Sequence, residues 1–190
     1  MPLFTFSEIF DIVIMTLVVG YIFSGLFKRP VRDDYDPLKH FKPGFDLQDF
    51  KFAVMVTVPA IIFHELGHKF VALSYGLEAQ FQAAWLFLGL ALILKLMNFG
   101  FIFLVPAYIS ILGQATPLEF GLIAFAGPAV NLILWTFAAF ALKKNLFNKK
   151  YDTLLFLTSK INMFLFIFNM LPIPGFDGSK VFTGLIQAFF

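Results

Sequence analysis

The feature that most constrains the fold is a set of long apolar segments separated by short polar ones. About 20 predominantly apolar residues allow a helix to cross the hydrocarbon core of a bilayer. Four segments reach that length, at residues 8–27, 52–75, 118–142 and 152–171. The chain is 59% hydrophobic and 14% charged, whereas soluble domains are about 45–50% apolar and about 25% charged. The sequence therefore predicts an all-α polytopic protein, a multi-pass integral protein of the cell membrane.

Charge and residue usage exclude several classes of function. The formal net charge is only +2, and no arginine-rich stripe is present, which argues against a nucleic-acid partner. The chain has no cysteine, so disulfides, thiolate metal sites and cysteine nucleophiles are excluded. The first ten residues, MPLFTFSEIF, lack the basic region of a signal peptide, and the first apolar segment is expected to be retained as a span. Because the chain has no cysteine, any metal must be held by nitrogen and oxygen atoms.

The segments outside the four spans are expected to stay within or beside the bilayer, as parts of a single domain covering residues 1–190. Residues 81–112 are predicted to be re-entrant or interfacial. Within them, 81–97 is an apolar stretch slightly short for a span, and 99–112 is rich in β-branched and aromatic residues. The latter composition predicts one or two short strands, a small re-entrant β element. Residues 179–190 are predicted to form a partial last helix.

Two histidines and a glutamate lie inside the second apolar segment, in the sequence HELGH. On a helix, residues four apart share a face, so His64 and His68 can converge on one Zn²⁺ ion. Glu65 can then take a proton from water activated by the metal. An ionised acid at the bilayer centre costs about 2.5–3.5 kcal/mol, and a bound cation offsets that cost. The alternative is a pair of buried, hydrogen-bonded histidines, which is disfavoured because the chain has only three histidines.

Two imidazoles leave the metal in need of a third protein ligand. The soluble metzincin pattern, HExxHxxGxxH, is not continued, because Val71 and Ser74 stand where the glycine and the third histidine are needed. Glu78 and Glu119 are possible ligands. Asp177 is favoured, because a glycine- and proline-bent loop after the last long span can direct its side chain back into the membrane. One zinc ion, two neutral histidines, this aspartate and the ionised glutamate of HELGH sum to zero charge, which suits a site of low dielectric constant.

HELGH and a second motif, NMLPIPGFDG at residues 169–178, together resemble the site-2 protease family of intramembrane zinc metalloproteases. The segment AGPAVN at 126–131 is similar to a third family element. The resemblance covers residues 52–180 in motif order. It implies a zinc-dependent endopeptidase that cleaves a transmembrane protein substrate within or next to its membrane segment. Many family members carry a PDZ or CBS module, and no stretch of this chain has room for either.

The resemblance also assigns roles to individual residues. It implies His64, His68 and Asp177 as zinc ligands and Glu65 as the general base, with Asn131 and Asn169 binding the substrate backbone or the oxyanion. For each asparagine a structural role is also open. Asn131 can form a hydrogen bond between helices, and Asn169 can cap the turn that follows it.

The expected ligands constrain the topology. The two histidines lie in the C-terminal half of span 52–75, and Asp177 lies just beyond the C-terminal end of span 152–171. These spans should therefore run in the same direction, with 118–142 running the opposite way and 81–97 not crossing the bilayer. Lysine-rich short loops tend to be cytoplasmic, which places the metal nearer the outer face. The family resemblance places it nearer the cytoplasm, and that orientation is weakly preferred.

A substrate helix must unwind before one of its peptide bonds can be attacked, and an unwound segment can add to a free strand edge. Such an edge within 99–112 is a candidate, and proline at Ile109 should weaken cleavage but not zinc content. The alternative function is a metal-binding membrane protein or zinc transporter without protease activity. A transporter needs ligands repeated along a path. Outside the expected site only His40 and scattered acids remain, which disfavours transport.

Overall fold

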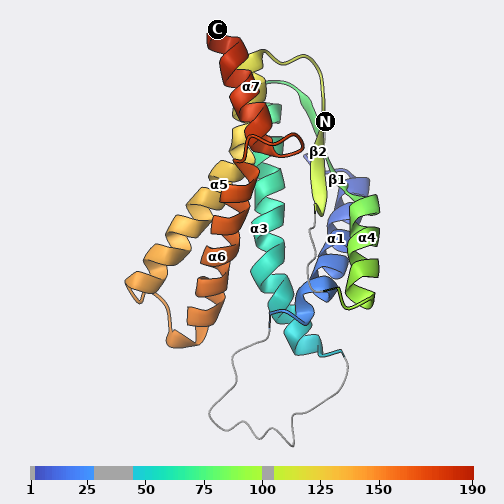
Figure 1. Cartoon of the computed structure of the whole chain (residues 1–190), viewed down its shortest axis with the longest axis vertical. Helices are drawn as coiled ribbons and strands as arrows, with labels where there is room; N and C mark the ends of the chain where they lie inside the picture. Colours follow the sequence, from blue (N-terminus) through green and yellow to red (C-terminus); the bar gives the residue numbers. More distant parts are fainter. Residues whose placement is uncertain (1–2, 28–44, 100–104) are drawn as a thin grey trace, which may run out of the picture.

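The computed structural model describes residues 3–27, 45–99 and 105–190. In chain order the elements are α1 (Phe6–Ser24), α3 (Leu47–Ser74), β1 (Glu78–Ala83), α4 (Trp85–Leu96), β2 (Ala107–Leu112), α5 (Pro117–Lys143), the short 3₁₀ helix η1 (Lys149–Tyr151), α6 (Asp152–Asn169) and α7 (Asp177–Phe189) (Figure 1). The protein is thus mostly helical with one small sheet.

The described part of the chain contains four helices that are long and apolar enough to cross a membrane, namely α1, α3, α5 and α6 with η1. They coincide with the four apolar segments of the sequence, although their ends differ. The second helix begins at Leu47 rather than at residue 52, because the Asp46 side chain accepts hydrogen bonds from the backbone N–H groups of Gln48 and Asp49 and caps it. The polar residues between the first two apolar segments are expected to form a loop, and residues 28–44 among them lie outside the described residues.

The long helix α3 occupies the middle of the molecule, with α5 and α6 on one side and α1 and α4 on the other (Figure 1). Helices α3 and α6 run in the same direction, and α5 runs the opposite way. This is the arrangement expected from the ligand positions. Helices α3 and α5 come very close at Gly67, where an added Cβ atom would lie 2.8 Å from the Ala126 carbonyl oxygen.

The sheet corrects part of the prediction for residues 81–112. Strands β1 and β2 pair antiparallel, with Phe81 opposite Ile109. The apolar stretch expected over 81–97 therefore begins in a strand, and its helix, α4, has only 12 residues. At 1.5 Å per residue this helix is about 18 Å long, shorter than the hydrocarbon core of about 30 Å. Of the strands expected in 99–112, β2 lies there, while residues 100–104 lie outside the described residues.

Helix α1 closes the edge of β1 that faces away from β2. The backbone N–H of Phe81 donates to Glu8 Oε1 at 2.7 Å, and that of Ala83 donates to Asp11 Oδ2 at 2.9 Å. Glu8 also forms an ion pair with Lys69, one residue after His68 in the chain, and both side chains are almost fully buried. Two carboxylates thus take the place of a third strand, and they anchor the sheet to α1 and α3.

An apolar core next to these contacts is shared by the sheet and three helices. Its buried members are Met15, Val19, Val58, Phe81, Ala83, Leu88 and Ala107. Because the core includes residues of both strands, the position of the sheet is set by packing as well as by the polar contacts to α1.

Candidate metal centre

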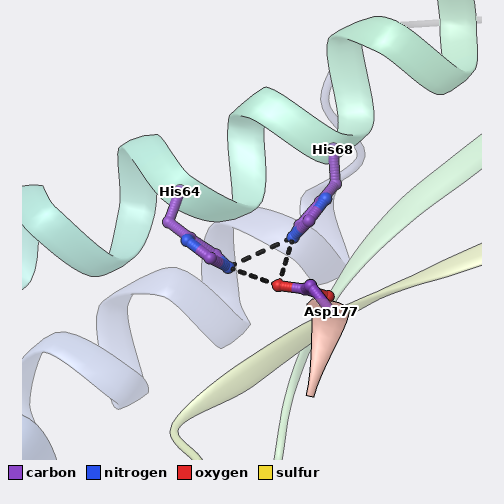
Figure 2. A group of neighbouring side chains, drawn as sticks. All are labelled: His64, His68 and Asp177. Atoms are coloured by element: carbon purple, nitrogen blue, oxygen red, sulfur yellow. Dashed lines mark hydrogen bonds and ion pairs between the residues drawn. The ribbon is translucent and has the colours of Figure 1, made fainter. Parts of the chain in front are cut away.

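The imidazoles of His64 and His68 project from the same face of α3 toward the Asp177 carboxylate (Figure 2). Their Nε2 atoms are 3.1 Å apart. Asp177 Oδ2 lies 3.2 Å from the Nε2 atom of His64 and 3.3 Å from that of His68. Both histidines are buried. The structure therefore brings together two residues of HELGH and a carboxylate 109 positions further along the chain from His68.

The local chain path explains how Asp177 reaches the histidines. Helix α6 ends at Asn169, and the chain turns sharply before α7 begins at Asp177. Gly175 within the turn has φ +100°, a conformation that glycine adopts without steric cost. A Cβ atom on Gly178 would lie 2.4 Å from the carbonyl carbon of Met170. Glycine at this position thus lets the first turn of α7 lie directly against the end of α6.

The three ligand atoms fit a zinc ion. They form a triangle with sides of 3.1, 3.2 and 3.3 Å. Ligand atoms bound at about 2.0–2.1 Å to a tetrahedral zinc ion lie about 3.3–3.4 Å apart. Helix α5 leaves this space open through Gly127, where an added Cβ atom would lie 2.3 Å from His68 Nε2 and 2.8 Å from His64 Nε2. The spacing of the ligand atoms, their chemical type and the space beside Gly127 are therefore all consistent with a bound zinc ion.

Both imidazoles are oriented by a partner on α5. The Nδ1 atom of His68 lies 2.7 Å from the backbone carbonyl oxygen of Ile123, which can only accept a hydrogen bond. The Nδ1 atom of His64 lies 2.6 Å from Asn131 Oδ1. Each ring therefore carries its proton on Nδ1 and presents the Nε2 lone pair to the centre, as in most histidine metal sites.

The acidic groups near the centre have different surroundings. Asp177 is half-buried, and its Oδ2 atom faces the Nε2 atoms of both histidines. An ionised carboxylate is the form that would bind a cation at this position. Glu65 is buried on α3, one position after His64.

The alternative third ligands lie elsewhere. Glu119 is bound to Thr116 in a capping box at the start of α5, and Glu78 is at the exposed start of β1. Among the described residues, the group of His64, His68 and Asp177 is the one whose ligand atoms could hold a metal ion.

The two asparagines expected to bind substrate occupy different positions. Asn131 is fully buried, and its amide nitrogen donates to the Ala60 carbonyl at 3.1 Å and to Asn162 Oδ1 at 2.8 Å. Both amide hydrogens are used within the protein in this structure, and the substrate-binding role of Asn131 stays a prediction. Asn169 is the half-buried last residue of α6, and its substrate-binding role stays a prediction. Asn162 was not singled out from the sequence.

Comparison with known proteins identifies the family. The chain is 38% identical over 188 residues to “Putative zinc metalloprotease MJ0611” of Methanocaldococcus jannaschii, covering 95% of this chain and 87% of that protein. The chain belongs to this zinc metalloprotease family. The identity is 29% over 132 residues to “Putative zinc metalloprotease sll0528” of Synechocystis, covering 70% of this chain but 30% of that protein. It is 26% over 163 residues to “Putative zinc metalloprotease YwhC” of Bacillus subtilis, covering 75% and 72%.

No family model matches the chain, and no solved structure matches it. The cofactor of this metalloprotease is Zn²⁺, consistent with the geometry of the metal centre.

Proposed function

We propose that this metalloprotease is a membrane-embedded endopeptidase of the site-2 protease type, which hydrolyses a peptide bond within or next to a transmembrane segment of its substrate. One observation carries the proposal. The ligand atoms of His64, His68 and Asp177 lie within 4.8 Å of one another, and two of these ligands and the buried Glu65 belong to α3, a helix long and apolar enough to cross a membrane. Most large exposed side chains on α5 and α6 are apolar, among them Phe137, Phe140, Phe156, Phe164 and Ile167, and the exceptions are Lys143 and Lys160. A lipid bilayer is the solvent that suits such a surface.

The residues of the site have separate roles in hydrolysis. His64, His68 and Asp177 hold the zinc ion. Bound zinc supplies Lewis-acid chemistry, because it lowers the pKa of water toward about 7 and polarises a carbonyl group. Glu65, in the same helical turn as His64, accepts the proton of the attacking water and returns it to the leaving amine. His64, Glu65 and His68 are buried, whereas Asp177 is half-buried.

The free edge of β2 is the proposed binding site for the unwound substrate. Phe81 and Ala83 direct their backbone N–H groups toward α1, so the alternate residues of β1 face β2. In the antiparallel register, Tyr108 and Ser110 face β1. Ile109 between them therefore directs its backbone outward. Among the described residues β2 pairs only with β1, and its outer edge can take a further strand.

Packing connects this edge to the metal centre. Ile111 of β2 packs in a cluster with Ala72 and Ile123. Ala72 lies one turn after His68 on α3, and the carbonyl of Ile123 orients the His68 ring. A strand bound along β2 would therefore end beside the catalytic residues, which suits a substrate whose scissile bond must reach Glu65.

The test is Glu65→Gln in the full chain reconstituted into lipid vesicles with a transmembrane test substrate. The proposal predicts one zinc per chain and no cleavage. The matched control is Glu119→Gln, which alters a half-buried capping glutamate at the start of α5 and should leave cleavage unchanged. Undiminished cleavage by Glu65→Gln would overturn the proposal. So would wild-type vesicles that transport zinc and do not cleave, since this is the behaviour of the alternative, a zinc transporter.

A further inference from the structure

We infer that Asn162 of α6 is a positioning residue that acts through Asn131 to orient the His64 ring at the zinc site. The inference rests on the proposed zinc-dependent function and adds a residue that touches neither metal nor substrate. The two asparagines and the histidine form a continuous hydrogen-bonded chain across α6, α5 and α3. We call this chain the asparagine relay.

Backbone carbonyls determine the direction of every bond in the asparagine relay. The Asn162 side chain meets the Thr158 carbonyl at 2.8 Å, and a carbonyl only accepts, so the amide nitrogen of Asn162 faces Thr158 and its oxygen faces Asn131. The Asn131 side chain likewise meets the Ala60 carbonyl at 3.1 Å, which directs its nitrogen there and to Asn162. Its oxygen is left for His64, whose Nδ1 must then carry the proton.

The direction matters because only one arrangement of the His64 ring presents the Nε2 lone pair to the metal. If the Asn131 amide rotated by half a turn, its nitrogen would face Nδ1 of His64 and favour the tautomer with the proton on Nε2. That tautomer cannot bind zinc through Nε2. Asn162 opposes the rotation, because its oxygen accepts a hydrogen bond from the Asn131 nitrogen at 2.8 Å.

The burial of the relay supports a specific role. Asn131 and Asn162 are both 0% exposed. A buried polar group destabilises the folded protein unless it has hydrogen-bond partners. His68 is oriented separately, by the Ile123 carbonyl of α5. Changes on α6 should therefore disturb only one of the two imidazoles, and a general loss of packing would disturb both.

Zinc affinity of the purified full chain tests the inference, measured by competition with a chromophoric chelator. The variants are Asn162→Leu and Asn162→Ser. The serine hydroxyl can donate a hydrogen bond to the Thr158 carbonyl, as the Asn162 amide does. The serine side chain is too short to reach Asn131, so the hydrogen bond to Asn131 is lost. Loss of an outer partner of a metal ligand weakens binding about 10–100-fold, and we expect a loss in that range. Ser159→Ala changes another buried polar residue of α6 and should leave zinc affinity unchanged.

A double-variant comparison separates positioning from general destabilisation. If Asn162 acts through Asn131, Asn162→Ser should have no further effect on zinc affinity once Asn131→Leu is present. Equal, additive losses in both backgrounds would overturn the inference, as would wild-type affinity of both Asn162 variants. Cobalt substitution adds a second readout, because a displaced His64 should change the visible absorption of the bound Co²⁺. Failure of the wild-type chain to bind zinc would instead refute the proposed function.

Discussion

Replacing Gly127 by alanine should strongly weaken zinc binding at the metal centre. The added Cβ atom would lie 2.3 Å from His68 Nε2 and 2.8 Å from His64 Nε2. Non-bonded atoms keep separations of about 3.5–4.0 Å, so the methyl group must move the two rings or α5 by about 1 Å. A zinc ion about 2.0–2.1 Å from the same nitrogen atoms competes with the methyl group for this space.

The size of the effect follows from the number of ligands disturbed. Loss of one orienting partner weakens metal binding about 10–100-fold, and here two ligands are displaced together. We therefore expect a loss of about 100-fold or more, equivalent to about 2.8 kcal/mol at 1.4 kcal/mol per tenfold change. The assay is chelator competition on purified protein, with cleavage of a transmembrane test substrate measured in parallel.

The matched control for this prediction is Gly89→Ala on α4. A Cβ atom there has no neighbour within 4 Å, and alanine is favoured over glycine within helices by about 1 kcal/mol. Zinc affinity should stay at the wild-type value and stability should be equal or higher. If Gly127→Ala also bound zinc with wild-type affinity, the metal would not occupy the space between α3 and α5, and the geometric argument would be refuted.

Two further predictions concern the sheet. Glu8→Gln should destabilise the protein by about 3–5 kcal/mol, because it leaves the buried Lys69 ammonium without a counter-charge. Denaturant unfolding in detergent measures the free energy of unfolding. Adding Lys69→Met should restore much of the lost stability. Ile109→Pro should abolish or strongly weaken cleavage while zinc content stays at one per chain, because proline removes an outward N–H group; the paired measurements are substrate cleavage and bound zinc.

Each of these has a discriminating comparison. Unchanged stability of Glu8→Gln would mean that the ion pair with Lys69 does not hold α1 and the sheet on α3. The comparison for Ile109→Pro is Ser110→Pro. The backbone of Ser110 faces β1, so proline there should remove a hydrogen bond within the sheet and lower the stability of the protein. Cleavage at the wild-type rate by Ile109→Pro would remove the outer edge of β2 as a substrate site.

Local patterns in the sequence were enough to predict the helical part of the site. Histidines four apart lie on one face of any helix, so His64 and His68 needed no tertiary information. The four long apolar segments likewise specify helices by length alone. Asp177 was favoured among three acids, because the bent loop before it can reverse the chain direction.

Other features depend on contacts between distant segments and leave no local signal. Strand β1 has the sequence EAQFQA, which lacks β-branched residues, and its edge is satisfied by Glu8 and Asp11 of a different helix. Asn162 follows the polar residues Thr158, Ser159 and Lys160 in the middle of α6, so the sequence does not distinguish it from them. Its role arises only because α6 packs beside Asn131. The same contact gives Asn131 a partner within the protein, while its substrate-binding role stays a prediction.

The most direct test of the account is a zinc anomalous-difference map from crystals of the full chain. We expect one strong peak about 2.0–2.2 Å from the Nε2 atoms of His64 and His68 and from an oxygen of Asp177. A peak elsewhere in the molecule, or a zinc ion bound to the two histidines with Asp177 directed away from it, would contradict the central claim.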